Sequence, residues 1–229
     1  MSGLLTFVSV CGIITSLLLI LAPLPAYIKA WRTKNTAGLS VEYILASNVS
    51  QIAWGLYGMK ESAMAILLPS GVGVVLTFGY LVVYEALLGP VLGFITAYLT
   101  TGIVAVAVLY RVLSVSQLGL SCLLLSVANC LSALFQPVHA YQRRDPTLID
   151  LNISLALLLC GLSWTGYGLL TQDPFVLIPN LLCQFVALVN ITVWGILDES
   201  GLVQIWWVRI RSLWKESKLK KQAEGYFWV

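Results

Sequence analysis

One short pattern occurs twice in the chain with the same internal spacing. It reads W-x-x-Y-G, then ten residues, then proline followed by a small polar residue. The second copy lies 110 positions after the first, and the matched pairs are Trp54 and Trp164, Tyr57 and Tyr167, Gly58 and Gly168, and Pro69 and Pro179. A pattern repeated without any insertion or deletion predicts two structural units of the same kind, each built around one copy.

The composition restricts these units to a membrane. The chain has 229 residues, of which 59% are hydrophobic and only 10% are charged, with a mean hydropathy of +0.90. A soluble domain with so few charges lacks the polar surface to cover itself. A helical crossing takes about 20 apolar residues, so the chain is long enough for about seven crossings. Because strand-like alternation is absent, we predict an all-α membrane protein with seven transmembrane helices.

Breaks in hydrophobicity divide the chain into predicted helices and a tail. The helices are expected at 4–30, 40–59, 62–88, 90–112, 116–141, 150–171 and 174–198. The first lacks a basic leader region and a small-x-small cleavage site, so we interpret it as a retained helix rather than a signal peptide. The tail at 199–229 is basic and rich in tryptophan, which favours a helix lying on an anionic cytosolic leaflet.

Basic residues at the helix ends predict the orientation. With the N-terminus outside, eleven Lys and Arg side chains fall on the cytosolic side and two, Lys60 and Arg111, on the outer side. Cytosolic loops carry the excess of positive charge in membrane proteins. The sequence therefore predicts a multi-pass protein with its N-terminus outside and its C-terminus in the cytosol. The plasma membrane is favoured, and the Golgi or another endomembrane is left open.

The two copies fit a 3+1+3 arrangement of the seven helices. We predict a first three-helix repeat at 4–88, a linking transmembrane helix at 89–112 and a second three-helix repeat at 113–198. Three crossings are an odd number, so the linking helix is needed for the two repeats to be parallel. Parallel repeats are related by an axis along the membrane normal, with a substrate site where they meet near the midplane.

Two segments resemble those of a known transporter family. LAPLPAYIKAWRTKNTAGLS (21–40) is similar to its helix-1 proline and following loop, and WTGYGLLTQDPFVLIPN (164–180) resembles its second-repeat segment almost residue for residue. On these residues the chain resembles the SWEET (MtN3/saliva) sugar transporters, which are related to PQ-loop transporters. The resemblance implies a facilitative uniporter of mono- or disaccharides that works by alternating access.

The candidate substrate-binding residues surround the repeated pattern. Ser47 and Gln51 lie seven and three positions before Trp54, so a helix places all three on one face. An indole ring offers a flat apolar face to a sugar, and its N–H can donate a hydrogen bond. A single membrane tryptophan is often only an interfacial anchor, but a symmetry-related pair favours a pocket.

The resemblance supplies the remaining contacts. It places substrate contacts at Trp164 and Asn180, with Trp54 and Ser70 at the pseudo-symmetric positions. The carboxamide of Asn180 is both a donor and an acceptor, which suits a pair of sugar hydroxyls.

Four candidate gate residues also follow from the resemblance. The family carries four prolines near the cytosolic ends of its gating helices, and Pro23 and Pro137 match two of them. Tyr43 and Asp150 stand at the other two positions. Asp150 can cap the helix that follows it, or it can act as a protonatable group of the gate. The sequence favours the cap.

Two alternative functions remain open at this stage. One is a proton-coupled exporter of amino acids or other small metabolites, as in PQ-loop proteins, for which Asp150 would carry the proton. The other is a retrieval receptor of the KDEL-receptor type, which needs several inward arginines. The seven predicted helices contain a single arginine, Arg111, and it lies at a helix end, so this function ranks last.

Neither an enzyme nor a cofactor is expected. The chain has no P-loop, nucleophile elbow or dinucleotide-binding turn. Its five cysteines lie in apolar stretches without a C-x-x-C pair, and it has one histidine, so no metal site is predicted. The predicted partners are a small-molecule substrate and the lipid bilayer, with no nucleic acid. A homo-oligomer is left open.

Overall fold

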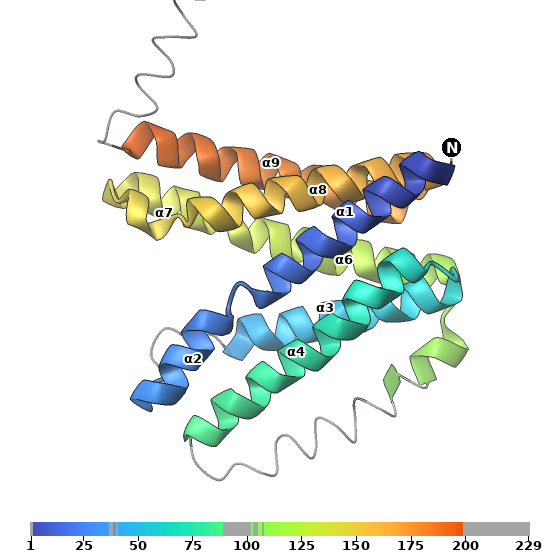
Figure 1. The fold of residues 1–229 in the computed structure, drawn as a ribbon, viewed down its shortest axis with the longest axis horizontal. Helices are drawn as coiled ribbons and strands as arrows, with labels where there is room; N and C mark the ends of the chain where they lie inside the picture. The colour runs from blue at the N-terminus through green and yellow to red at the C-terminus, as the bar shows by residue number, and fades with distance from the viewer. Residues whose placement is uncertain are drawn as a thin grey trace, which may run out of the picture.

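The computed structural model describes residues 2–36, 39, 41–88, 102, 105–106 and 108–198. The described chain is helical (Figure 1). Its elements are α1 (Ser2–Leu21), α2 (Leu24–Thr33), α3 (Val41–Lys60), α4 (Met64–Leu88), α6 (Val115–Ala133), α7 (Phe135–Arg143), the 3₁₀ helix η1 (Pro146–Leu148), α8 (Leu151–Thr171) and α9 (Pro174–Leu197). The predicted tail at 199–229 and most of the predicted helix at 90–112 lie outside the described residues.

The first and fifth predicted helices are each broken in two. Pro23 lies between α1 and α2 and Pro25 in the first turn of α2, while Pro137 lies in the first turn of α7, just after the break at Leu134. Proline has no backbone N–H, and its ring clashes with the carbonyl four residues earlier. The N–H of Leu134 accordingly bonds the carbonyl of Leu131, three residues back, at 3.2 Å.

Five segments of the described chain are long and apolar enough to cross a membrane. They are Gly3–Thr33, Met64–Leu88, Val115–Arg143, Leu151–Thr171 and Pro174–Leu197. The helix α3 is less apolar than these five segments, and its middle carries the polar residues Ser47, Asn48, Ser50 and Gln51. The chain is therefore a multi-pass membrane protein in which α3 is a comparatively polar helix.

The helices contact each other in two matching sets, which we call the first helix set (α1–α4) and the second helix set (α6–α9). Within the sets, α3 packs on α4 as α8 packs on α9, and α1 contacts α4 as α6 contacts α9. Between the sets, α1 packs on α8 as α6 packs on α3. The helices lie close together where α1 begins and spread apart toward α2 and α7 (Figure 1).

The match between the two sets extends to single backbone conformations. Among the described residues, the non-glycine positions with positive φ are Lys34 and Ser62 in the first set, and Arg144 and Gln172 in the second. Each second-set residue lies 110 positions after its first-set counterpart. Lys34 and Arg144 are left-handed caps that end α2 and α7, a common way for a helix to stop.

The glycine of the repeated pattern has a structural reason. A Cβ atom on Gly58 would lie 2.9 Å from the backbone nitrogen of Leu67, and one on Gly168 would lie 2.9 Å from that of Leu177. Only a residue without a side chain lets α3 approach α4, and α8 approach α9, this closely. The two glycines therefore fix each helix hairpin at the same level.

We predict that Gly58→Ala and Gly168→Ala each destabilise the protein by about 1–3 kcal/mol, because an added methyl group must push two helix backbones apart. The unfolding temperature of the detergent-purified protein measures this. Gly79→Ala on α4 is the matched control, since a Cβ there meets nothing within 4 Å and alanine is the better helix former. An unfolding temperature of Gly168→Ala equal to that of the wild type would contradict the close-packing argument.

Candidate functional site

A cavity of about 260 Å³ lies between the two helix sets. Most of its lining consists of residue pairs that are 110 positions apart. These pairs are Ser16 and Ser126, Ser50 and Cys160, Trp54 and Trp164, Ile66 and Val176, Pro69 and Pro179, and Ser70 and Asn180. The two helix sets therefore contribute equivalent surfaces to one cavity, and its lining follows the internal repeat.

The structure brings most of the predicted substrate-binding residues together. Five of them line the central cavity: Gln51, Trp54, Ser70, Trp164 and Asn180. The sixth, Ser47, lines a neighbouring cavity of about 130 Å³. Gln51, Leu19 and Ile20 line both cavities, so the two hollows adjoin.

Both cavity tryptophans are held by a serine from the opposite helix set. The indole N–H of Trp164 donates to Ser16 Oγ at 2.9 Å, and that of Trp54 donates to Ser126 Oγ at 3.3 Å. Gly12 leaves room for the Trp164 ring, since a Cβ there would lie 3.0 Å from the indole. In this state the indole donors are bonded to protein, so the rings offer a ligand their apolar surface.

The sequence reasoning missed Ser16 and Ser126. Neither serine belongs to the repeated pattern, and each lies on the first long helix of its set. Their signal was nevertheless present, because they are separated by the same 110 positions. Extending that spacing from the second and third helices of each set to the first would have paired them.

In each helix set, a proline directly precedes a polar residue that lines the cavity. Pro69 lies inside α4 and Pro179 inside α9, and each removes a helical hydrogen bond one turn back. Asn180 follows Pro179, and its amide donates to the carbonyl of Val176 at 2.7 Å. This bond uses one N–H of the carboxamide and leaves its oxygen to accept from a hydroxyl group.

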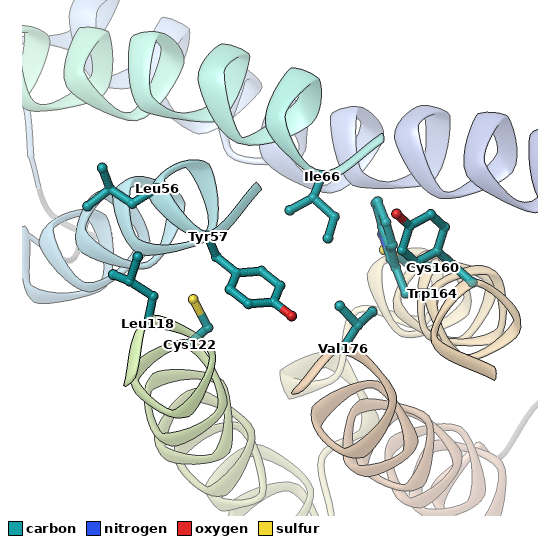
Figure 2. Packing of buried hydrophobic residues seen from close by; sticks show 9 residues of the cluster. Leu56, Tyr57, Ile66, Leu118, Cys122, Cys160, Trp164 and Val176 are labelled. Atoms are coloured by element: carbon teal, nitrogen blue, oxygen red, sulfur yellow. The ribbon is translucent and has the colours of Figure 1, made fainter. Parts of the chain in front are cut away.

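Tightly packed side chains close the cavity at the end where α1 begins. Tyr57 is buried there, and Figure 2 shows its ring between Leu118 and Cys122 of α6 and Val176 of α9. Its hydroxyl donates to Asp173 Oδ2 at 2.8 Å. This bond joins the end of α3 to the start of α9, so the two helix sets are tied together at this end.

Asp173 serves α9 at the same time. Its other oxygen, Oδ1, accepts from the backbone N–H of Phe175 at 2.9 Å and caps the helix. In the sequence, Tyr57 stands out only as part of the repeated pattern, and Asp173 is one of two residues between the predicted helices at 150–171 and 174–198. Their contact joins residues 116 positions apart, and nothing in the local sequence indicates it.

The neighbouring cavity lies beside the break between α1 and α2. The predicted gate residues Pro23 and Tyr43 line it, as do Tyr27 and Tyr80. The rings of Tyr27 and Tyr80 stack with centroids 4.4 Å apart, and the Tyr80 hydroxyl donates to the carbonyl of Ile20 at 3.1 Å. Aromatic side chains therefore brace the broken helix at this end.

The other two predicted gate residues line neither cavity. Pro137 is buried in the first turn of α7, and the residue 110 positions before it is Tyr27 rather than Pro23. The spacing of 110 positions that pairs Lys34 with Arg144 therefore does not pair Pro23 with Pro137.

Asp150 is exposed and caps α8, accepting from the N–H of Ile153 at 3.0 Å. The cap that the sequence favoured is therefore present in the structure.

Comparison with known proteins gives the same internal spacing. The family model MtN3/saliva, described as a sugar efflux transporter for intercellular exchange, matches residues 6–88 and 116–200. The two matches begin 110 positions apart. The chain belongs to the MtN3/saliva family. The sequence resemblance to this family is thereby confirmed.

Relatives and a solved structure agree with this assignment. The bidirectional sugar transporter SWEET4 of Oryza sativa subsp. indica is 26% identical over 208 residues, covering 85% of this chain and 80% of the relative. The sugar transporter SWEET1 of Dictyostelium discoideum is 23% identical over 203 residues, covering 83% and 92%. A eukaryotic SWEET transporter structure matches with a TM-score of 0.77 at 17% identity, covering 85% and 96%. This last likeness shows that the fold is shared.

We predict that Ser16→Ala and Ser126→Ala each lower stability by about 1–3 kcal/mol, because each leaves an indole N–H between the two helix sets without its acceptor. Thermal unfolding of the purified protein measures this. Ser9→Ala is the matched control on α1, since its hydroxyl bonds only the carbonyl of Leu5 in its own helix.

A double-mutant cycle isolates the indole–serine pair. Once Trp164→Phe has removed the donor, Ser16→Ala should lower stability no further. An undiminished loss in that background would show that Ser16 acts through a different contact.

Proposed function

We propose that this MtN3/saliva chain is a facilitative transporter of mono- or disaccharides that works by alternating access. The observation that carries the proposal is the central cavity, lined by equivalent residues from two helix sets in a family of sugar transporters. A single site shared by two matching units can be exposed to either side of the membrane by a change in how the units meet.

The proposed architecture is the 3+1+3 arrangement. Residues 4–88 form the first repeat, 113–198 the second and 89–112 the linking helix. The matching contacts within and between the two helix sets support this division, as does the double match of the family model. With the N-terminus outside, the start of α1 faces the outside of the cell. The helices α2 and α7, at the opposite end of the bundle, then face the cytosol. We place the protein in the plasma membrane.

In this orientation the Tyr57–Asp173 hydrogen bond closes the outer end. The neighbouring cavity, with Pro23 and Tyr43 in its wall, extends the hollow toward the cytosol. Sugar exchange then requires the Tyr57–Asp173 bond to open, while the cytosolic ends move together. The break at Pro23 supplies the hinge for that motion, and gate roles for Pro137 and Asp150 stay predictions.

The chemistry of the lining favours a neutral, hydroxyl-rich substrate. Neither cavity is lined by an Asp, Glu, Lys, Arg or His side chain among the described residues. Two indole rings suit the C–H face of a sugar, and the serine hydroxyls and the Asn180 carboxamide suit its hydroxyl groups. An amino acid or a peptide carboxylate would bury its charge without a partner, so the two alternative functions are not favoured.

We predict that Trp164→Ala and Asn180→Ala each lower sugar uptake by about ten-fold or more, since losing the ring or the amide costs at least about 1.4 kcal/mol. Uptake of labelled glucose and sucrose into liposomes holding the purified protein measures this. Trp31→Ala and Asn152→Ala are the controls, because both residues are exposed and line neither cavity. Wild-type uptake in both cavity variants would contradict the assigned site.

We predict that Asp150→Asn keeps sugar flux near the wild-type rate and independent of a pH gradient. Asparagine caps a helix about as well as aspartate, and a uniporter moves no proton. The measurement is uptake in the same liposomes with and without an imposed pH gradient. Sugar accumulation driven by the gradient in the wild type, and lost in Asp150→Asn, would instead establish proton coupling.

A further inference from the structure

Two thiols face each other across the second helix set. Cys130 of α6 and Cys183 of α9 are both free, and their sulfur atoms lie 2.9 Å apart. A disulfide needs a sulfur–sulfur distance of about 2.05 Å, so bond formation requires a movement of about 1 Å. The two helices pack against each other in this state, so this movement needs no rearrangement of the fold.

The pair differs from a buried structural cysteine in its access to the cavity. Cys183 is half-buried and lines the central cavity, whereas Cys130 is 6% exposed. A small uncharged reagent that enters the cavity can therefore reach Cys183 directly. Cys130 lies behind it, placed to react next.

The pair is also absent from the first helix set. The residues 110 positions before Cys130 and Cys183 are Ile20 and Gly73, which cannot form such a bond. The internal repeat therefore does not account for the two cysteines, because the first helix set packs at the equivalent positions without any sulfur atom. The thiol pair is therefore a feature of the second helix set alone.

We propose that Cys130 and Cys183 form a redox-sensitive site that is oxidised to a disulfide by a peroxide entering the cavity, and that this bond arrests transport. The arrest rests on the proposed sugar transport, whereas formation of the disulfide does not.

The oxidation balances with hydrogen peroxide as the oxidant. The Cys183 thiol gives up its proton as its sulfur attacks one peroxide oxygen, the O–O bond breaks, and the departing hydroxide takes up that proton as water. The product is a sulfenic acid on Cys183. The Cys130 thiol then gives up its proton as its sulfur attacks Cys183 Sγ, the S–O bond breaks, and the leaving hydroxide takes up that proton as a second water. Two thiols lose two electrons, and one peroxide is reduced to two waters.

The position of the bond explains why it would stop transport. Cys130 lies one turn before the break at Leu134 that separates α6 from α7, and Cys183 lies one turn after Asn180 on α9. A covalent link here holds the end of α6 against the cavity wall that carries Asn180. The second helix set then loses its freedom to adjust around the sugar and at the break.

The covalent step is tested on the purified full-length protein treated with hydrogen peroxide. The wild type should lose two of its five titratable thiols without gaining oxygen, and digestion should release a Cys130–Cys183 linked peptide that a dithiol reductant separates. Cys130→Ala should lose no thiol pair and should instead keep an oxidised, unpaired Cys183. The matched control Cys11→Ala, a half-buried thiol outside the cavity, should still form the link. Retention of all wild-type thiols, or a link between other cysteines, would overturn the site.

The functional step uses labelled glucose uptake into liposomes. Peroxide should reduce wild-type and Cys11→Ala uptake to the level of protein-free liposomes, and the reductant should restore it. Cys130→Ala should transport before treatment and keep most of its uptake afterwards. A linked protein that still transports at the untreated rate would overturn the arrest, while a protein without sugar uptake before oxidation would contradict the proposed function instead.

Discussion

The close contact of helix backbones at Gly58 and Gly168 fixes the level of the cavity residues that α3, α4, α8 and α9 carry. Each glycine meets the backbone of the next helix, at Leu67 or Leu177. This contact sets the level at which the tryptophan, one turn earlier, faces the proline and polar residue of the following helix. Because both hairpins are fixed in the same way, their cavity surfaces meet as equivalents. If these helices packed less closely, the tryptophans and the polar residues would not lie at the same level of the helix bundle.

The scaffold of the cavity is symmetric, but its chemistry is not. The residue equivalent to Ser70 of the first helix set is a carboxamide, Asn180, in the second, and the residue equivalent to Ser50 is Cys160. Trp164 is 8% exposed, whereas Trp54 is half-buried. A sugar has no two-fold symmetry, so under the proposed function these unequal walls can hold it in a single orientation. The repeat supplies the shape of the cavity, and the substitutions between its copies make its two walls chemically different.

Hydrogen bonds between the helix sets stabilise the state that the structure describes. A buried donor inside a membrane protein needs an internal acceptor, because lipid offers none. The indoles meet Ser16 and Ser126, and the phenol of Tyr57 meets Asp173. In the proposed transport cycle, opening the end at Tyr57 must exchange the last of these bonds for water or substrate. These three contacts are polar, so replacing them by other hydrogen bonds changes the free energy only modestly, as the proposed alternating access requires.

The sequence by itself predicted most of the described helices, their internal repeat and the family. Apolar length and proline or turn residues fix helix ends in a bilayer, so predicted bounds such as 174–198 lie close to Pro174–Leu197. The fixed spacing singled out both tryptophans, and the family resemblance added Asn180; all three line the cavity. Only the tertiary structure showed that the indoles bond serines of the opposite set, that Tyr57 reaches Asp173, and that Pro137 lies outside both cavities. Those contacts depend on the rotation and crossing of helices far apart in the chain, which the periodicity of one helix does not encode.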